Sequence, residues 1–440
     1  MNHKSDVKVK KSAFIWDLAV IGAGASGMMA AITAARHGKR VILLEQKDRC
    51  GKKLSATGNG KCNFTNEDMQ LSCFYGNQTL AEAVLGRFSK EDTLRFFREI
   101  GIVPKSRNGY YYPNSEQASS VITALLLELK RLGVTIVNSA RLLAAEKTKD
   151  GFVCRLQDAS YACRKLLFAT GLRASPKLGS DGSAFSIIKG FGHRFMPIVP
   201  ALCGCYCNGA DFKKMAGVRA DARLSLFLDG QPAGVERGEL QLTDYGLSGI
   251  PVFQLSRLAS MALYEKKQVE IQVDFLPDID WDVLLMELKL RLARFGELGS
   301  LWECFHGLLH QKILCALLGT RKTLSDKELP EFAGQLKNLS VLVEQMRDFE
   351  FAQVCAGGIR TEEIHMETLE SKLVPGLYFC GELLDVDGIC GGYNLQWAWS
   401  SGYAAGLSAA SEKSYDSRPR NPGQYVKQGM VFPPDTGEML

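Results

Sequence analysis

The stretch from Asp17 to Glu45, DLAVIGAGASGMMAAITAARHGKRVILLE, constrains the fold of this chain more than any other. Its apolar run at Leu18–Ile21 is typical of a strand that is buried on both faces. The glycines that follow are spaced G-x-G-x-x-G, which provides a sharp turn, room for a pyrophosphate and close packing of a helix against a strand. These glycines are Gly22, Gly24 and Gly27.

The rest of this stretch completes a strand–helix–strand unit. Small and apolar residues from Ser26 to His37 predict a crossover helix that ends at Gly38. A second apolar run, Val41–Leu44, predicts the next parallel strand, and Glu45 follows it directly. An acidic residue at that place is expected to bind a ribose hydroxyl group. The sequence therefore predicts a Rossmann-type site for a dinucleotide.

Composition narrows the class of protein. A chain of 440 residues exceeds a single hydrophobic core, so two or three domains are expected. The net charge of +5 is small for this length and favours no nucleic-acid partner. Apolar windows are too short to span a membrane, and the first residues lack the apolar centre of a signal peptide. Thirteen cysteines without framework spacing favour a reducing environment, so we expect a cytoplasmic protein with no membrane partner.

A second glycine-rich passage, CGKKLSATGNGKCNFTN at Cys50–Asn66, follows the predicted ribose-binding acid. It has neither helical nor strand periodicity, which predicts a structured loop. Its backbone N–H groups and Lys53 would lie near phosphate or flavin oxygens. An ordinary surface loop is the alternative, but this much glycine favours a functional loop.

The remaining segments predict how the chain is divided. A strand ending in Thr170-Gly171 would bring the backbone close to the ligand a second time. Residues 196–275 alternate in polarity and predict a mainly β region, whereas Trp281–Phe295 and Leu301–Leu318 have helical periodicity. A buried strand at Gly376–Cys380 then precedes a helix of small residues, whose positive amino-terminal end would favour a reduced flavin.

Taken together, these segments resemble the BaiN and aminoacetone oxidase-like family of FAD-dependent oxidoreductases. The resemblance spans about residues 14–412. Its signatures are GAGASGMMAA at 22–31, GKKLSATGNGKCNFTN at 51–66, GELQLTDYGLSGIPVFQLSR at 238–257 and VPGLYFCGELLDVDGICGGYNLQWAWSSGYAAG at 374–406.

The resemblance implies an α/β fold with a discontinuous, doubly wound, Rossmann-like FAD-binding domain of the glutathione reductase type. Together with the changes in residue pattern along the chain, the resemblance places this FAD-binding domain at residues 14–190 and 354–412. A β-rich middle domain is expected at 191–275 and 330–353, and a small helical insertion at 276–329. Residues 1–13 and 413–440 are expected to be tails.

The resemblance also implies roles for single residues around FAD. The pyrophosphate would be held by Gly22, Gly24, Ala25 and Gly27, and the adenosine ribose by Glu45 with Gln46 beside it. Lys53, Gly58, Asn63, Thr170 and Gly171 would border the cofactor, and Leu142 would touch the adenine. The ribityl chain and flavin ring would be enclosed by Gly381, Glu382, Asp387, Gly392, Asn394 and Leu395. Asp244 departs from the family, which often has His there, and Leu172 replaces a usual glycine.

A flavin supplies the electron chemistry, so hydride exchange between its N5 atom and an organic substrate is expected. A second G-x-G-x-x-G unit is absent from the sequence, so a dedicated NAD(P)H domain is not expected. NAD(P)H would use the same flavin face as the substrate, in turn, or oxygen would reoxidise the flavin. A C-x-x-x-x-C pair is also absent, which disfavours disulfide reduction.

Three functions remain open. The first is NAD(P)H-linked reduction of an activated C=C bond in a small molecule, such as an unsaturated ketone of the bile-acid type, with Tyr393, Arg360 or Tyr245 as proton donor. The second is oxidation of a small amine by oxygen. The third is a non-catalytic FAD-binding protein, because a fold by itself never determines function. The sequence leaves the substrate and the oligomeric state open.

Two groups of metal-ligand residue types have simpler interpretations. Cys203, Cys205 and Cys207 alternate, but they lack a fourth ligand and C-x-x-C spacing, so buried packing is favoured over a zinc site. His306 and His310 are four apart on a predicted helix, but no H-E-x-x-H motif accompanies them. No metal is therefore expected.

Overall fold

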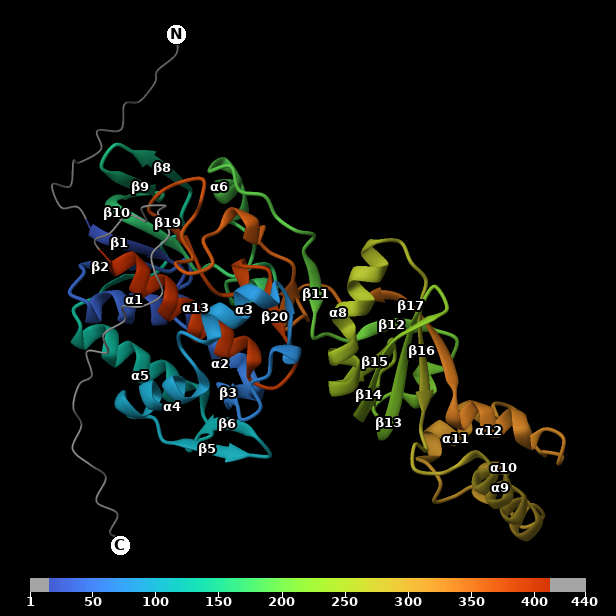
Figure 1. Ribbon diagram of the computed structural model, residues 1–440. Helices are drawn as coiled ribbons and strands as arrows, with labels where there is room; N and C mark the ends of the chain where they lie inside the picture. The colour runs from blue at the N-terminus through green and yellow to red at the C-terminus, as the bar shows by residue number, and fades with distance from the viewer. Residues whose placement is uncertain (1–15, 412–440) are drawn as a thin grey trace, which may run out of the picture. The chain divides into compact units, whose positions relative to one another are not determined.

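The computed structural model describes residues 16–411. The predicted tails at 1–13 and 413–440 lie outside the described residues. A seven-stranded sheet with the order β7-β2-β1-β10-β9-β8 forms the centre of the nucleotide-binding part, and β19 also pairs with β10 (Figure 1). Strands β7, β2, β1, β10 and β19 run parallel, whereas β8 and β9 form an antiparallel hairpin on β10. The strands are β1 (Trp16–Ile21), β2 (Val41–Leu44), β7 (Thr135–Val137), β8 (Ala144–Thr148), β9 (Gly151–Arg155), β10 (Ser160–Phe168) and β19 (Leu377–Phe379).

Both ends of the described chain build this part. Helix α1 (Ala25–Arg36) follows β1, and helix α13 (Tyr393–Ala410) packs along it, as the blue and red ribbons of Figure 1 show. The approach is close because α13 carries glycine at the contact. A Cβ atom at Gly402 would lie 2.4 Å from the Ser26 carbonyl oxygen, and one at Gly406 would lie 2.5 Å from that of Ala30. The α/β Rossmann-like fold predicted from the sequence is confirmed.

The second glycine-rich passage is not the continuous loop that we predicted. It contains a helix, α2 (Lys52–Ala56), and a 3-10 turn, η1 (Thr57–Gly60), before strand β3 (Thr65–Asn66). These elements are too short to show a period. Local hydrogen bonds support them, because the Thr57 hydroxyl donates to the Leu54 carbonyl at 2.7 Å. Strand β3 pairs with β6 (Tyr110–Pro113), which in turn pairs with β5 (Pro104–Arg107).

The β-rich region closes into a barrel with the order β12-β15-β14-β13-β16-β17. Its strands are β12 (Cys205–Asn208), β13 (Arg219–Leu228), β14 (Gln231–Leu242), β15 (Gly246–Gly249), β16 (Val269–Asp274) and β17 (Leu339–Met346). One helix, α8 (Ile250–Tyr264), was missed by the sequence analysis and packs against β14. It approaches where β14 has glycine, since a Cβ at Gly234 would lie 3.0 Å from Leu255. Strands β11 (Val199–Ala201) and β18 (Val354–Ala356) pair with each other in a separate two-stranded sheet.

Four helices occupy the chain between β16 and β17. Helix α9 (Trp281–Phe295) has the predicted bounds, but residues 301–318 form two helices, α10 (Leu301–Cys304) and α11 (Gln311–Leu318), instead of one. Gly307, with φ +79°, lies in the break. Helix α12 (Leu329–Lys337) begins where the predicted helical insertion ends, at residue 329, and it buries Phe332, Ala333 and Leu336 on one face.

The remaining elements are α3 (Gln78–Leu85), α4 (Lys90–Glu99), α5 (Ala118–Arg131), α6 (Phe185–Gly190), α7 (Phe212–Met215), β4 (Phe74–Gly76) and β20 (Val386–Gly388), with short 3-10 turns at Leu71–Cys73, Pro176–Leu178, Thr361–Glu363 and Gly381–Leu383. Helix α4 begins with a capping box between Ser89 and Asp92. Within residues 16–411, no helix is long and apolar enough to cross a membrane.

Candidate active site

A cavity of about 800 Å³ lies at the carboxyl ends of the central parallel strands. Gly22 follows β1, Glu45 follows β2 and Thr170 follows β10, and all three line it. This edge of a parallel sheet is where open α/β folds bind their ligands. All but three of the cofactor-binding residues predicted from the sequence line this cavity. They are Gly22, Gly24, Ala25, Glu45, Gln46, Lys53, Gly58, Asn63, Leu142, Thr170, Gly171, Glu382, Gly392, Asn394 and Leu395.

The turn between β1 and α1 requires glycine. Gly22 has φ +99°, and a Cβ there would lie 2.6 Å from the Ala169 carbonyl oxygen. A Cβ at Gly27 would lie 1.9 Å from the Gly22 carbonyl oxygen, so this glycine permits helix–strand packing and does not line the cavity. At Gly24, which caps α1, a Cβ would meet no protein atom within 4 Å. The first turn of α1 is therefore open towards the cavity, as an anion-binding helix start requires.

Glu45 is held rigidly at the end of β2. Its carboxylate accepts the Ala23 N–H at 2.7 Å and the Lys47 N–H at 2.8 Å, and only 8% of the residue is exposed. The neighbouring Gln46 donates its side-chain amide to the Gly179 carbonyl. The acidic group is thus fixed before any ligand arrives.

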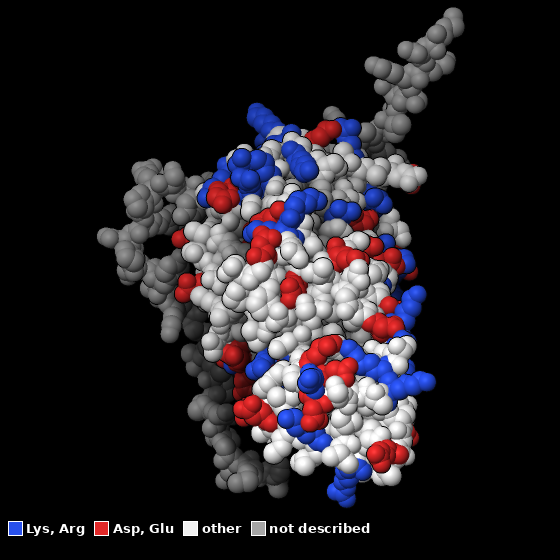
Figure 2. Space-filling view, turned by 90° about the vertical axis from the view of Figure 1, so that its right-hand side faces the viewer, with Lys and Arg blue, Asp and Glu red and all other residues white. Residues whose placement is uncertain are grey.

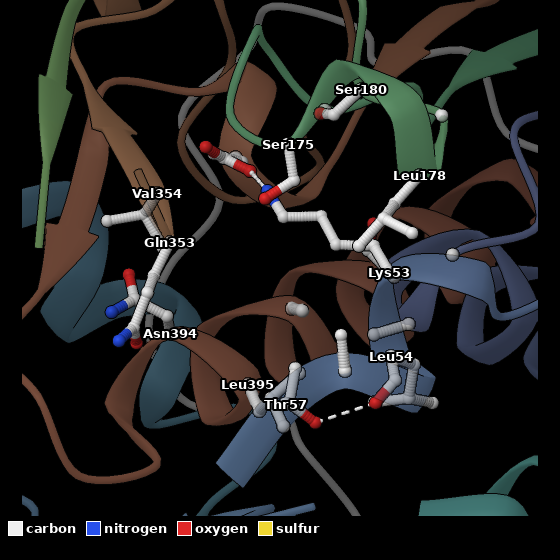
Figure 3. A pocket seen from close by; sticks show the side chains of 18 of the residues that line it. Lys53, Leu54, Thr57, Ser175, Leu178, Ser180, Gln353, Val354, Asn394 and Leu395 are labelled. Carbon is white, nitrogen blue, oxygen red and sulfur yellow. Dashed lines mark hydrogen bonds and ion pairs between the residues drawn. The ribbon is translucent and has the colours of Figure 1, made fainter. Parts of the chain in front are cut away.

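Lys53 reaches across the cavity from α2. Its Nζ atom lies 2.8 Å from Oε2 of Glu382, and Oε1 of the same carboxylate accepts the Cys355 N–H at 2.7 Å. Figure 3 shows the extended Lys53 side chain with its charged end near Ser175. This ion pair joins two segments that are far apart in the sequence, one from each end of the nucleotide-binding part.

Two polar atoms on the cavity wall have no protein partner. Asn63 Oδ1 and Ser180 Oγ are buried without a hydrogen bond, and both residues line the cavity. Because buried polar atoms are nearly always paired, these two atoms indicate a polar ligand. A Cβ at Gly392 would lie 2.8 Å from Asn63 Oδ1, which places this free acceptor beside the start of α13.

The turn before α13 is held by Asn394. Its Oδ1 atom accepts the Gly388 N–H at 2.9 Å, and its Nδ2 atom donates to the Gly388 carbonyl at 2.7 Å. Gly391 and Gly392 at this turn line the cavity, so the positive end of α13 lies at the cavity wall. These donors, the free acceptors and the glycine turn match the shape and chemistry of a flavin dinucleotide.

Gly381 and Asp387, the other two predicted residues outside the cavity wall, support it from behind. A Cβ at Gly381 would lie 2.5 Å from Ser26 Oγ, so this glycine lets the chain pass close to α1. Nε of Arg257, on α8, lies 2.9 Å from each carboxylate oxygen of Asp387. Burial raises the pKa of Asp387 to about 6 although Arg257 opposes the shift. The Asp387 carboxylate is thus occupied by the protein itself.

The three predicted proton donors do not line the cavity. Tyr393 is buried, with its ring 5.8 Å from that of Phe74, and Arg360 is exposed. Tyr245 lies beside Tyr206 at the barrel, 5.1 Å between ring centroids. These residues were chosen because they lie in or near the family signatures, but the sequence does not show the direction in which their side chains point.

Two phenols that were not among the predicted site residues do line the cavity. Tyr110 and Tyr112 lie on β6 and belonged to the aromatic segment GYYYPNS. A Cβ at Gly391 would lie 2.9 Å from the Tyr110 ring, so this phenol is close to the start of α13. Burial raises the pKa of Tyr112, which therefore keeps its proton at neutral pH.

One end of the cavity is apolar. Leu202 directly follows β11, and Ile250 and Phe253 lie on α8. Ile389 and Cys390 face the same cavity from the segment before α13. Burial raises the pKa of the Cys390 thiol to about 12, so it stays protonated. Because no fixed charge lies on this wall segment, it suits an apolar substrate.

The histidines and cysteines that were considered as metal ligands from the sequence contact nearby groups of the protein. His306 donates from Nδ1 to the Glu303 carbonyl, and His310 Nδ1 accepts the Lys312 N–H; the two histidines lie between helices and not on one. Cys205 and Cys207 have their sulfur atoms 3.4 Å apart. In the part of the chain that the structure describes, no three His, Cys, Asp or Glu side chains are grouped to hold a metal ion.

The fold and this site define an FAD-dependent oxidoreductase. Residues 16–408 match the family described as "HI0933-like protein Rossmann domain", and the chain belongs to that family. The resemblance stated from the sequence signatures is thereby confirmed.

The chain is similar to other proteins over most of its length. It is 42% identical over 404 residues to 3-dehydro-bile acid delta(4,6)-reductase of Clostridium scindens, covering 89% of this chain and 98% of the relative. It is 28% identical to ribosomal RNA dihydrouridine synthase of Escherichia coli, covering 91% and 99%. The structure of 3-ketosteroid delta1-dehydrogenase from Sterolibacterium denitrificans matches 91% of this chain and 100% of that chain, at 11% identity and a TM-score of 0.49.

Proposed function

We propose that the protein uses FAD to reduce a C=C bond conjugated to a carbonyl group in a small apolar substrate. The observation that carries this proposal is the 42% identity, over 98% of its length, to a relative named as a bile acid delta(4,6)-reductase. The apolar wall formed by Leu202, Ile250 and Phe253 supports a substrate of that kind. Dihydrouridine synthase, the name of another relative, also implies saturation of a C=C bond conjugated to a carbonyl, in uracil.

We propose that each part of FAD contacts a different set of the residues that line the cavity. The open turn at Gly22–Ala25 binds the pyrophosphate, Glu45 binds the ribose, and Leu142 contacts the adenine. Lys53 and Asn63 border the flavin ring beside the start of α13. When bound, the flavin supplies the hydride chemistry.

The protein's own part in the reaction is to exclude water and to hold a proton. The apolar wall displaces water from the substrate, which strengthens every hydrogen bond made there. We place the hydrogen-bond donor for the substrate carbonyl on β6, at the Tyr110 or Tyr112 hydroxyl, because both phenols face the cavity. A donor aimed at the oxygen stabilises the charge that develops as hydride adds to the conjugated bond.

We further propose NAD(P)H as the electron donor, entering in turn from the substrate side. We also propose that the chain is divided into the FAD-binding, β-rich and helical domains at the boundaries predicted from the sequence, and that the protein is located in the cytoplasm. All thirteen cysteines are free thiols, in agreement with a reducing environment.

The test is anaerobic reduction of the purified yellow protein followed by substrate addition. NADH or NADPH should bleach the flavin absorbance, and a 3-oxo-4-ene steroid should restore it with formation of the saturated ketone. Bleaching by a small amine such as aminoacetone, without NAD(P)H, would instead support the oxidase that the sequence left open. Failure of both NAD(P)H and the steroid to change the spectrum would contradict the proposal.

Reduction of uridine in ribosomal RNA is the second candidate, favoured by the 28% identity over 99% of the Escherichia coli enzyme. RNA binding normally needs a broad basic surface. On the face shown in Figure 2, however, lysine and arginine are interspersed with aspartate and glutamate, and much of the middle is uncharged. Incubating the reduced protein with a uridine-containing rRNA fragment tests this candidate directly.

A further inference from the structure

Arg347, which directly follows β17, is enclosed by aromatic rings. Its guanidinium carbon lies 3.6 Å from the ring centroid of Phe351, 4.3 Å from that of Tyr245 and 5.5 Å from that of Tyr206. We call these four residues the arginine cage. Each such contact stabilises the cation, because the faces of aromatic rings carry partial negative charge.

Among the residues that the structure describes, the guanidinium in the cage has no counter-ion. Within residues 16–411 it forms no ion pair, and its Nε atom is buried without a hydrogen-bond acceptor. Three arginines of the barrel and α8 differ in this respect, because Arg223, Arg237 and Arg257 each pair with an aspartate. A positive charge that is half-buried among rings and lacks an acceptor indicates a ligand that supplies one.

The cage lies beside the apolar end of the cavity. Leu202 and Gln353 line that end, and the Gln353 N–H points to the Leu202 carbonyl at 3.4 Å. Figure 3 shows Gln353 and Val354 at the cavity wall. Two residues past Leu202, the Gly204 carbonyl accepts the Arg347 N–H at 2.9 Å. Two residues span at most about 7 Å, so the backbone of Arg347 lies close to the apolar wall, although none of the four cage residues is part of that wall.

The ring of Phe351 packs against the Arg347 guanidinium group on its solvent-exposed side. Phe351 lies two residues before Gln353, and 54% of it is exposed although its ring contacts the guanidinium. Planar guanidinium groups bind carboxylates through two parallel hydrogen bonds.

We propose that the arginine cage is a subsite for a carboxylate carried by the substrate. The inference rests on the proposed function and extends it, since it makes the substrate an apolar body with a conjugated ketone at one end and an anionic group at the other. The ketone end lies towards the start of α13, the apolar body lies against Leu202 and Phe253, and the carboxylate lies on Arg347.

The test compares an acid with its ester on the FAD-loaded, full-length protein. The probes are a 3-oxo-4-ene steroid with a side-chain carboxylate and the methyl ester of the same compound. Binding is measured from the shift in flavin absorbance, without turnover. Hydrogen bonds to charged groups predict that the acid binds roughly 10- to 100-fold more tightly than the ester. Arg347→Gln should remove this ratio by weakening the acid alone, and Arg347→Lys should retain part of it.

Arg219→Gln is the matched control. Arg219 lies on barrel strand β13, is 61% exposed at its side chain and pairs with Glu239, and its loss should leave the ratio unchanged. Equal binding of acid and ester by the wild type overturns the subsite, and reduction of both compounds would leave the proposed function intact. The wild-type ratio decides the question even if Arg347→Gln does not fold. Weaker binding of a uridine-containing rRNA fragment by Arg347→Gln, with the steroid acid unaffected, also overturns it.

Discussion

The ion pair between Arg257 and Asp387 offers the most quantitative test of the structure. It joins α8, which carries the apolar wall, to β20, which precedes the turn of α13. The Asp387 side chain is 4% exposed and that of Arg257 is 17% exposed. The pKa of Asp387 is raised from 3.8 to about 6 by burial, even with Arg257 in contact. Removing Arg257 should raise this pKa further and leave the carboxyl group neutral when folded.

The expected loss of stability in Arg257→Met depends on pH. An unfolded aspartate has a pKa near 3.8, so a neutral folded Asp387 costs about 5 kcal/mol at pH 7.5, against about 3 kcal/mol in the wild type. The variant should therefore lose about 2 kcal/mol through ionisation at pH 7.5. At pH 5.5 the wild-type carboxyl group is already mostly protonated, so this component should fall close to zero. Loss of the contact between Arg257 and the Tyr75 ring adds about 1 kcal/mol at both pH values.

Urea unfolding of the FAD-saturated protein at pH 7.5 and 5.5 measures these differences. Asp387→Asn and the double variant complete a cycle, in which the double variant should show no pH-dependent loss relative to Asp387→Asn. A penalty for Arg257→Met that is equal at the two pH values, or larger at pH 5.5, would refute the reasoning. It would mean that the pair is solvated and that burial does not raise the pKa of Asp387.

Three further predictions concern the cavity. Asn63→Leu should raise the FAD dissociation constant about tenfold and leave the urea midpoint of the apoprotein unchanged, since Oδ1 has no protein partner; a destabilised apoprotein would contradict this. Tyr110→Phe should lower kcat for the conjugated ketone about 100-fold, while Tyr393→Phe should stay within about twofold of the wild type, and the reverse order in steady-state assays would restore the sequence-based choice. Gly27→Val should destabilise the protein by about 3 kcal/mol and yield colourless protein, because a Cβ there lies 1.9 Å from a carbonyl oxygen; a yellow, stable variant would be inconsistent with the packing.

The nucleotide-binding part was predictable because its signals are local. The glycine spacing, the apolar runs and Glu45 each depend on neighbours within one strand–helix–strand unit, and the elements appear where the sequence placed them. The short elements in the second glycine-rich passage were missed, since α2 and η1 are held by side-chain hydrogen bonds that have no periodic pattern. The break at Gly307 was missed because apolar spacing continues across it. The three domain boundaries and the roles of single cofactor-binding residues stay predictions.

By itself, the sequence determined that this chain builds a Rossmann-like fold for FAD, because turns, close approaches and buried strands are encoded by residue type and spacing. Only the tertiary structure decided which side chains reach the cavity. The Asp387 carboxylate contacts Arg257, which lies on the distant helix α8. Tyr110 lines the cavity, whereas Tyr393 does not. Arg347 is enclosed by rings from three separate segments. These arrangements depend on long-range packing, and the order of residues along the chain carries no direct record of it.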